Sequence, residues 1–466
     1  MVKKMSCGVC GKDIRYLQYV AAFCVGILDL SAYMTASWIS PVMPLLTAEN
    51  SPIGVTLTND EVSWVAACFG LGFTVGSILI PLLFDRIGPK RILLLSSAFI
   101  FLMWICVGLA KSIALLVVGR FIAGLGAAIK TSCYSIYICE IANKDIRGKL
   151  GTIPVLVAIW GNIFILTAGP YLEYSKLIII CAIFPVIFFF IFSFIPDSPY
   201  YLLKTGRKNE AQLSLTRFSR SSASVEEIKS KLQEIEETIR KDMDNLTLKQ
   251  SLCAPNFRKS LIIVCVANMI VSFCGISFIT TYLQVIVASA NTALSPKMAS
   301  VIFGLIQIPS VISSMLLLDK LGRKAVFCVS SLGAALAIIC EGIYLYLQDK
   351  INLDSVAFLP ILFLTVYKFS ISFGVLHLPF FFIGEFFTTQ TKKVAAFIVA
   401  GSFGFFTFLN IKILGSLFDS WGIYTMCWIF GGVSISGIIF ALLVLPETKG
   451  KELTIIQNDL SQTKIK

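Results

Sequence analysis

Twelve long apolar blocks dominate the chain and limit what it can fold into. Each is close to the ~20 residues that a helix needs to cross the hydrocarbon core of a bilayer. Only 14% of residues are charged, against about 25% in soluble domains, and most charges lie between the blocks. Because lipid offers no hydrogen-bond partner to a backbone, the blocks predict membrane-spanning α-helices. They are residues 17–37, 61–83, 92–110, 114–138, 150–170, 177–195, 259–285, 297–318, 325–347, 355–383, 394–417 and 422–445.

Basic residues are distributed unevenly between the loops. One alternate set of loops, counted with both ends of the chain, holds 31 of the 39 Lys and Arg residues. The opposite set holds only Lys111, Lys176, Lys297 and Lys350. The positive-inside rule then predicts a multi-pass protein with both termini in the cytoplasm, and we expect the plasma membrane. The net charge of +12 is therefore a sign of topology and of contact with the lipid bilayer, and we expect no nucleic-acid partner.

The chain repeats itself once. Three motifs from the first part recur in the same order, offset by 234, 245 and 250 residues. Two related halves with a binding site between them near the midplane are a transporter architecture. The repeats pair Asp85–Lys90 with Asp319–Lys324, Glu140 and Arg147 with Glu385 and Lys392, and Pro196–Pro199 with Pro446–Gly450.

These features predict an all-α membrane protein of twelve transmembrane helices in two six-helix halves, with a short cytosolic helical insert. The insert begins with the capping-box spacing of Ser224 and Glu227, and apolar residues then recur every three or four positions up to Ile239. We expect this amphipathic helix to pack on the underside of the spans, and a separate partner-binding domain is the alternative. The predicted parts are an N-terminal tail 1–16, a first half 17–195, a linker 196–258, a second half 259–445 and a C-tail 446–466.

No chemistry of an enzyme is visible in the sequence. The only histidine is His377, inside a predicted span, so a Ser-His-Asp or Cys-His site has no second candidate. Cys7 and Cys10 form a CxxC pair that lacks two further zinc ligands nearby. We therefore expect neither a metal nor a cofactor, and the sequence names no protein partner.

Seven motifs together carry a resemblance to a known family. From about Trp38 to Gln457 the chain resembles the sugar-porter branch of the major facilitator superfamily, most closely the insect facilitated trehalose and hexose transporters. The resemblance implies facilitative transport of a small polar solute, such as a hexose or trehalose, by alternating access. The motifs are DRIGPKR (85–91), GRFIAGLGA (119–127), YICEIANKDIRGKLG (137–151), PDSPYYLLKTGR (196–207), DKLGRK (319–324), GEFFTTQTKKVA (384–395) and PETKGKEL (446–453).

The same resemblance implies a gating network on the cytoplasmic side. Short charged loops at helix ends can close that side through ion pairs and helix-dipole contacts. Asp85 with Arg86, and Asp319 with Arg323, are expected to bridge spans within each half. In the outward-open state, a second set is expected to join the halves. The gating candidates are Asp85, Arg86, Gly88, Lys90, Glu140, Arg147, Asp319, Arg323, Glu385, Lys392 and Glu447.

Most polar side chains that bind sugar in this family are replaced here. The matching positions are Val155, Val271, Ser272, Ser277, Ser372, Phe380, Phe403 and Gly404. Gln307, Tyr282 and Thr407 survive from the family's set, and the further candidates for solute contact are Ser277, Thr281 and Phe380. An organic anion or another non-sugar solute, or a non-transporting solute sensor, is therefore the alternative function.

Asp29, Lys130, Lys368 and His377 are ionisable residues inside predicted spans, where such residues mark functional sites by default. Asp29 and Lys130 either neutralise each other as a buried pair or contact solute. Lys368 either snorkels to the outer surface or faces the cavity, and His377 is either a satisfied core residue or a ligand. Coupled relatives carry an acid near the position of Met34, so we expect transport without protons.

The charge distribution generates a topological prediction. A cysteine placed at Ser222, in the polar linker, should stay unlabelled by an impermeant maleimide in intact cells. It should react after permeabilisation, because the positive-inside rule places the linker in the cytosol. Labelling in intact cells would contradict the orientation.

Overall fold

The computed structural model describes residues 16–143, 146–219, 224–244, 252, 255–290, 292, 294–387 and 391–449. Cys7, Cys10, Ser222 and the two tails lie outside the described residues. So do the side chains of Asp85 and Asp319, and therefore the bridges expected of them.

Within the described residues, twelve helical segments are long and apolar enough to cross a membrane. The first half is built from α1 Tyr16–Ser37, α2 Ile39–Leu46, α3 Asn59–Ile87, α4 Pro89–Gly108, α5 Ile113–Ile141, α6 Arg147–Ala168 and α7 Tyr174–Ser193. The second half is built from α12 Pro255–Phe273, α13 Ile276–Ser289, α14 Pro296–Leu305, α15 Gln307–Leu321, α16 Arg323–Leu347, η1 Asp354–Val356, α17 Leu359–Phe373, α18 Leu378–Phe386, α19 Lys392–Trp421 and α20 Ile423–Leu443.

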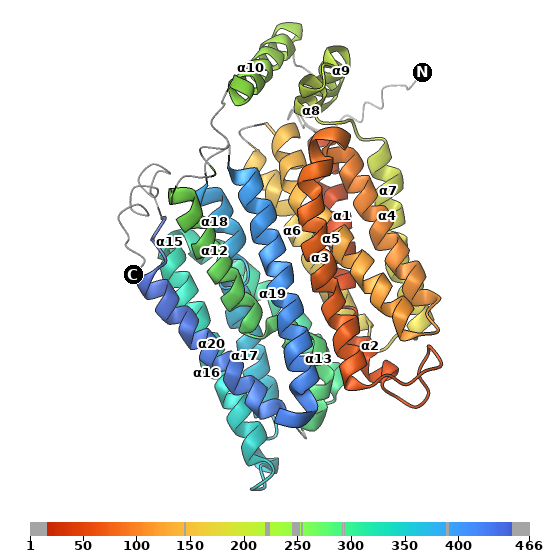
Figure 1. The fold of residues 1–466 in the computed structure, drawn as a ribbon, viewed down its shortest axis with the longest axis vertical. Helices are drawn as coiled ribbons and strands as arrows, with labels where there is room; N and C mark the ends of the chain where they lie inside the picture. The colour runs from red at the N-terminus through yellow and green to blue at the C-terminus, as the bar shows by residue number, and fades with distance from the viewer. Residues whose placement is uncertain are drawn as a thin grey trace, which may run out of the picture.

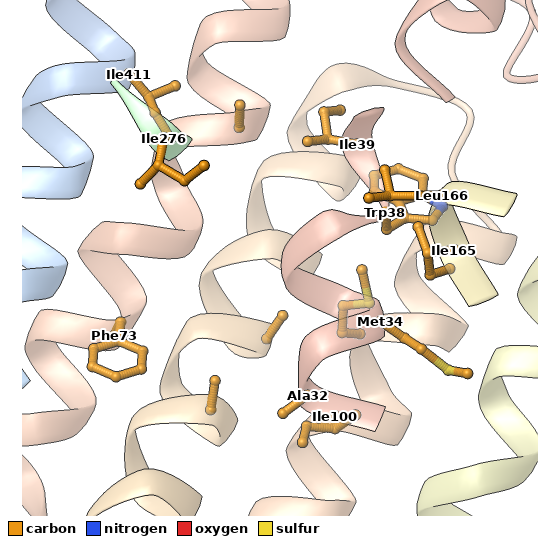
Figure 2. Close-up of a cluster of buried hydrophobic side chains, with 14 of the residues drawn as sticks. Ala32, Met34, Trp38, Ile39, Phe73, Ile100, Ile165, Leu166, Ile276 and Ile411 are labelled. Carbon is orange, nitrogen blue, oxygen red and sulfur yellow. The ribbon is translucent and has the colours of Figure 1, made fainter. Parts of the chain in front are cut away.

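Every predicted span corresponds to one of these segments. The first span is longer than predicted: it runs from Tyr16 to Leu46, because α2 continues α1 after a turn at Trp38. Apolar residues at the start of α2 extend the span, and Figure 2 shows Trp38 buried beside Ile165 and Leu166 of α6.

The two halves lie side by side as separate bundles, with α3 and α19 in contact along the seam between them (Figure 1). Three further pairs, α6 with α14, α2 with α13 and α5 with α19, also join the halves. Three short helices, α8 Pro199–Lys204, α9 Lys208–Phe218 and α10 Val225–Asp244, lie at one end of the bundles (Figure 1). We call this the insert end and the opposite end the far end.

The insert packs as a small layer of its own. The predicted amphipathic helix is α10, and the Ser224 hydroxyl accepts the Glu227 N–H at 3.1 Å at its start. α10 contacts α8 and α9, and Lys208 of α9 pairs with Glu236 of α10 at 2.7 Å. α9 in turn docks on the first span, where Gln18 donates to the Phe218 carbonyl at 2.7 Å.

Glycines set how closely the central helices approach. At Gly124 of α5, a methyl group would lie 2.1 Å from the carbonyl oxygen of Phe69 in α3. Across the seam, a methyl group at Gly70 would lie 2.7 Å from the carbonyl oxygen of Gly404 in α19. Small residues at such crossings let helix backbones touch, which is the main source of packing energy between helices in lipid.

We predict that Gly124→Ala lowers the thermal stability of the purified protein. The added methyl group meets backbone atoms that cannot move aside, and overpacking of this kind costs about 1–3 kcal/mol. Gly432→Ala in α20 is the matched control, because nothing lies within 4 Å of its added methyl group. Equal melting temperatures for the two variants would show that the α3–α5 contact is not tight.

Candidate functional site

Three spans of the second half are broken near their middle. α12 gives way to α13 at Gly275, α14 to α15 at Ile306, and α17 to α18 over residues 374–377. Gly275 adopts a φ of 99°, and a methyl group there would lie 2.4 Å from the Phe430 ring. Interrupted spans of this kind line the solute sites of membrane carriers, so the breaks define the candidate site.

The backbone groups released at two of these breaks have partners. The Tyr367 hydroxyl donates to the Cys274 carbonyl at 2.9 Å. The Ser330 hydroxyl donates to the Ser370 carbonyl at 2.5 Å and accepts the Val375 N–H at 3.0 Å. The interruptions are thus built into the packing of α16 and α17.

Gln307 begins α15 directly after one break and is 2% exposed. Its side-chain oxygen accepts a hydrogen bond from Asn162 of α6, which in turn accepts one from Ser37 at the end of α1. This chain of amides and hydroxyl joins the two halves. A solute hydroxyl could take the place of either amide, and the sequence reasoning had not singled out Asn162.

The other expected polar ligands mostly bond within the second half. Thr281 donates to the carbonyl of Ser277, one turn earlier in α13, at 2.8 Å. Thr407 of α19 shares a hydrogen bond with Ser272 of α12 at 3.4 Å. Tyr282 is buried, with its ring stacked on Phe278 at 4.5 Å.

Phe380 lies in a row of aromatic rings. Its ring meets Phe403 of α19 edge-on, with centroids 5.7 Å apart. Phe403 meets Phe73 of α3 in the same way at 6.2 Å. The row runs from α18 across the seam to the first half, so Phe380 supplies an apolar contact surface between the halves.

Asp29 of α1 and Lys130 of α5 form an ion pair, as the neutralising alternative expected. Both side chains are buried, at 3% and 4% exposure. The rings of Tyr33 and Tyr134 flank the ammonium at 5.8 and 5.6 Å. Lys130 is therefore not free to attract an anion without first leaving Asp29.

Lys368 does not snorkel, contrary to one expectation. It is 4% exposed, and its ammonium lies 5.1 Å from the centre of the Phe303 ring. His377 is the residue directly before α18, and its buried Nε2 has no hydrogen-bond partner among the described residues, so it is not a satisfied core histidine at that atom.

At the insert end, a network closes within the second half. Arg323 pairs with Glu385 at 2.9 Å, and Thr448 donates to the other Glu385 oxygen at 2.7 Å. Glu447 accepts the backbone N–H groups of Arg323 and Lys324 at 3.0 and 3.2 Å, and so caps the start of α16. Three of the gating candidates therefore meet.

The first half has no equivalent arginine, because Pro89 stands where the repeat places Arg323. Lys90 donates to the Ser193 carbonyl at 2.9 Å, and Gly88 lies against the Tyr201 ring. Glu140 keeps one buried carboxylate oxygen without a hydrogen-bond partner.

The other gating candidates do not meet in this structure. The side chains of Arg86, Arg147 and Lys392 are exposed, and no ion pair of theirs occurs among the described residues. The bridge expected from the Arg86 side chain does not occur among the described residues and stays a prediction. Lys393, next to Lys392, reaches across the halves, with its ammonium 5.7 Å from the Phe84 ring and 6.0 Å from the Tyr200 ring.

An ion pair at the far end joins the halves. Lys412 of α19 contacts Asp60 of α3 at 2.6 Å, and Ser416 donates to the same carboxylate oxygen at 2.7 Å. The ammonium also lies 4.5 Å from the Trp64 ring. Sequence reasoning missed Asp60, although a lone cation in the eleventh span signals that an acid is needed nearby.

Glu341 of α16 was also missed. It is fully buried, and neither carboxylate oxygen has a hydrogen-bond partner. A single acid in an otherwise apolar span was the available signal. Within the described residues, no group of three His, Cys, Asp or Glu side chains could hold a metal ion.

A family model described as "Sugar (and other) transporter" matches residues 20–460. The chain belongs to this family. It is 25% identical over 463 residues to the facilitated trehalose transporter Tret1 of Bombyx mori, covering 97% of this chain and 88% of the relative. It is 26% identical over 447 residues to Tret1 of Apis mellifera ligustica, covering 95% and 88%.

Solved structures share the fold of this family member. The partially occluded inward-open form of the xylose transporter XylE from E. coli superposes with a TM-score of 0.78 at 18% identity, covering 95% of this chain and 100% of that one. The peptide transporter POT in complex with sulfate gives 0.62 at 13% identity, covering 92% and 93%. Carriers named for a sugar and for peptides thus share one architecture, and the fold leaves the solute open.

We predict that Asp29→Asn and Lys130→Met each destabilise the protein more than the double variant does. Removing one partner leaves a buried unpaired charge, which typically costs about 3–5 kcal/mol. Thermal unfolding of the purified single and double variants measures the coupling. If the double variant loses as much stability as the two singles added together, the pair contributes nothing to folding.

We predict that Asp60→Asn and Lys412→Met change transport kinetics more than stability. Both remove the ion pair that joins the halves at the far end, so conformations separated at that end gain population. Accessibility of a cysteine placed at Ser416 should rise in both variants, with Lys176→Met as a surface-charge control. Unchanged accessibility would show that the pair does not hold the far end closed.

Proposed function

We propose that the chain is a facilitative carrier of a sugar or sugar alcohol in the plasma membrane, with both termini and the insert in the cytosol. The observation that carries the proposal is the family match over residues 20–460, with relatives named as facilitated trehalose transporters. The charge distribution of the loops supports the orientation.

The solute site lies between the halves beside the broken spans. Asn162 and Gln307 supply amides from opposite halves, and Phe380 supplies an apolar face of the kind that packs against a sugar ring. Ser277, Thr281, Tyr282 and Thr407 add hydroxyls from α13 and α19. Amides and hydroxyls can both donate to and accept from solute hydroxyls.

Alternating access follows from where the halves are tied. At the far end, which is extracellular in this orientation, Asp60 and Lys412 link α3 to α19. At the insert end, the Arg323–Glu385 pair stays within the second half. Transport exchanges the tie at the far end for one at the insert end, where Glu140, Arg147, Glu385 and Lys392 are available to form it.

Transport runs without proton coupling. Met34, at the position where coupled relatives carry an acid, is 1% exposed and lies in the buried apolar cluster (Figure 2). A facilitative carrier needs only two interconverting conformations and a solute site that is open to each side of the membrane in turn.

We predict saturable counterflow of labelled hexose or trehalose by the purified full chain in proteoliposomes. A protonophore should leave the rate unchanged, and Gln307→Ala should raise the half-saturating concentration because one amide partner of the solute is lost. Gly432→Ala serves as the control. Counterflow of none of these sugars would overturn the proposed function, and collapse on adding protonophore would overturn uniport.

A further inference from the structure

Three polar side chains of the tenth span have no hydrogen-bond partner among the residues that the structure describes. Lys368 is 4% exposed, and its ammonium lies over the face of the Phe303 ring. Ser372, one turn further along α17, is fully buried, and its hydroxyl has no partner. His377, at the start of α18, has a buried Nε2 without a partner.

The missing partners of these three side chains contrast with neighbouring polar groups, which are hydrogen-bonded or paired. In the same break, the Ser370 carbonyl and the Val375 N–H are both bonded to Ser330. The other buried lysine, Lys130, has a carboxylate in contact, whereas Lys368 forms no ion pair among the described residues. An uncompensated charge in a span is costly, and an ionisable residue there is by default a candidate functional site.

The three groups can serve one ligand. Lys368 and Ser372 are four residues apart in α17 and so share a helix face. His377 lies on the other side of the same break, five residues after Ser372, where α18 begins. An ammonium and a hydroxyl donate hydrogen bonds, and an imidazole donates through Nε2 in one tautomer, so the missing partner is an acceptor carrying negative charge.

We propose that Lys368, Ser372 and His377 form a subsite for a carboxylate, so that the solute is an acidic sugar such as a uronate or aldonate. This rests on the proposed function, since the amides and hydroxyls between the halves bind the hydroxyl groups of the same solute. Lys130 does not compete for the carboxylate because Asp29 already neutralises it.

The test compares the binding of D-glucuronate and D-glucose to the purified full chain at equal ionic strength. Binding is measured as the shift that each compound causes in the thermal unfolding of the protein. Glucuronate should stabilise the wild-type protein at lower concentration than glucose. Lys368→Met should weaken glucuronate binding about tenfold or more, the usual size of a lost hydrogen bond to a charged group, and leave glucose binding within about twofold. Lys368→Arg should retain glucuronate binding, and Lys176→Met is the surface-lysine control.

Several outcomes would overturn the subsite. The subsite is refuted if glucuronate binds no more tightly than glucose, or if it binds equally to the wild type and to Lys368→Met. It is also refuted if inorganic phosphate or acetate alone stabilises the protein as much as glucuronate does. If Lys368→Met does not fold, Ser372→Ala and His377→Gln carry the same comparison. Counterflow of neutral sugar without glucuronate binding would refute the carboxylate subsite but support the proposed carrier function. Glucuronate binding without counterflow of neutral sugar would support the subsite but refute the proposed function.

Discussion

Lipid offers no hydrogen bond to a protein backbone, and the architecture depends on this constraint. Because of it every span is helical, and wherever a span is interrupted the freed backbone groups need hydrogen-bond partners from elsewhere in the protein. Tyr367 and Ser330 meet that need at the breaks of α12 and α17. Because the partners come from neighbouring helices, the position of each break is fixed by packing, and the side chains around it hold defined places.

The seam between the halves combines a close contact with polar ties near its ends. Gly70 and Gly404 bring the backbones of α3 and α19 together, which concentrates dispersion contacts at one level of the seam. Around such a contact the bundles can rock as rigid bodies, while ion pairs and hydrogen bonds at either end are exchanged at low cost. Asp60 with Lys412 is a tie of that kind at the far end, whereas Asn162 with Gln307 joins the halves beside the break near the middle of a span.

The two buried lysines show how one residue type takes two roles. Lys130 is held by Asp29 between two tyrosine rings and strengthens the contact between α1 and α5. Lys368 has a ring but no carboxylate, so its charge is available to a solute. The difference arises from which helix faces which, and it decides where an anion could bind.

Sequence patterns were enough to predict the twelve spans, the twofold repeat, the amphipathic insert helix and the family. Each of these depends on hydropathy, periodicity or motif spacing, which are properties of neighbouring residues in the chain. The sequence also named both members of the Asp29–Lys130 pair, since opposite charges in lipid need each other. Helix packing joined Asp60 to Lys412, placed Asn162 against Gln307 and, among the described residues, gave Lys368 a ring but no acid as a neighbour. The first two contacts connect residues more than a hundred positions apart, and the surroundings of Lys368 depend on which helices pack against α17. Helix packing decides which of these distant side chains meet.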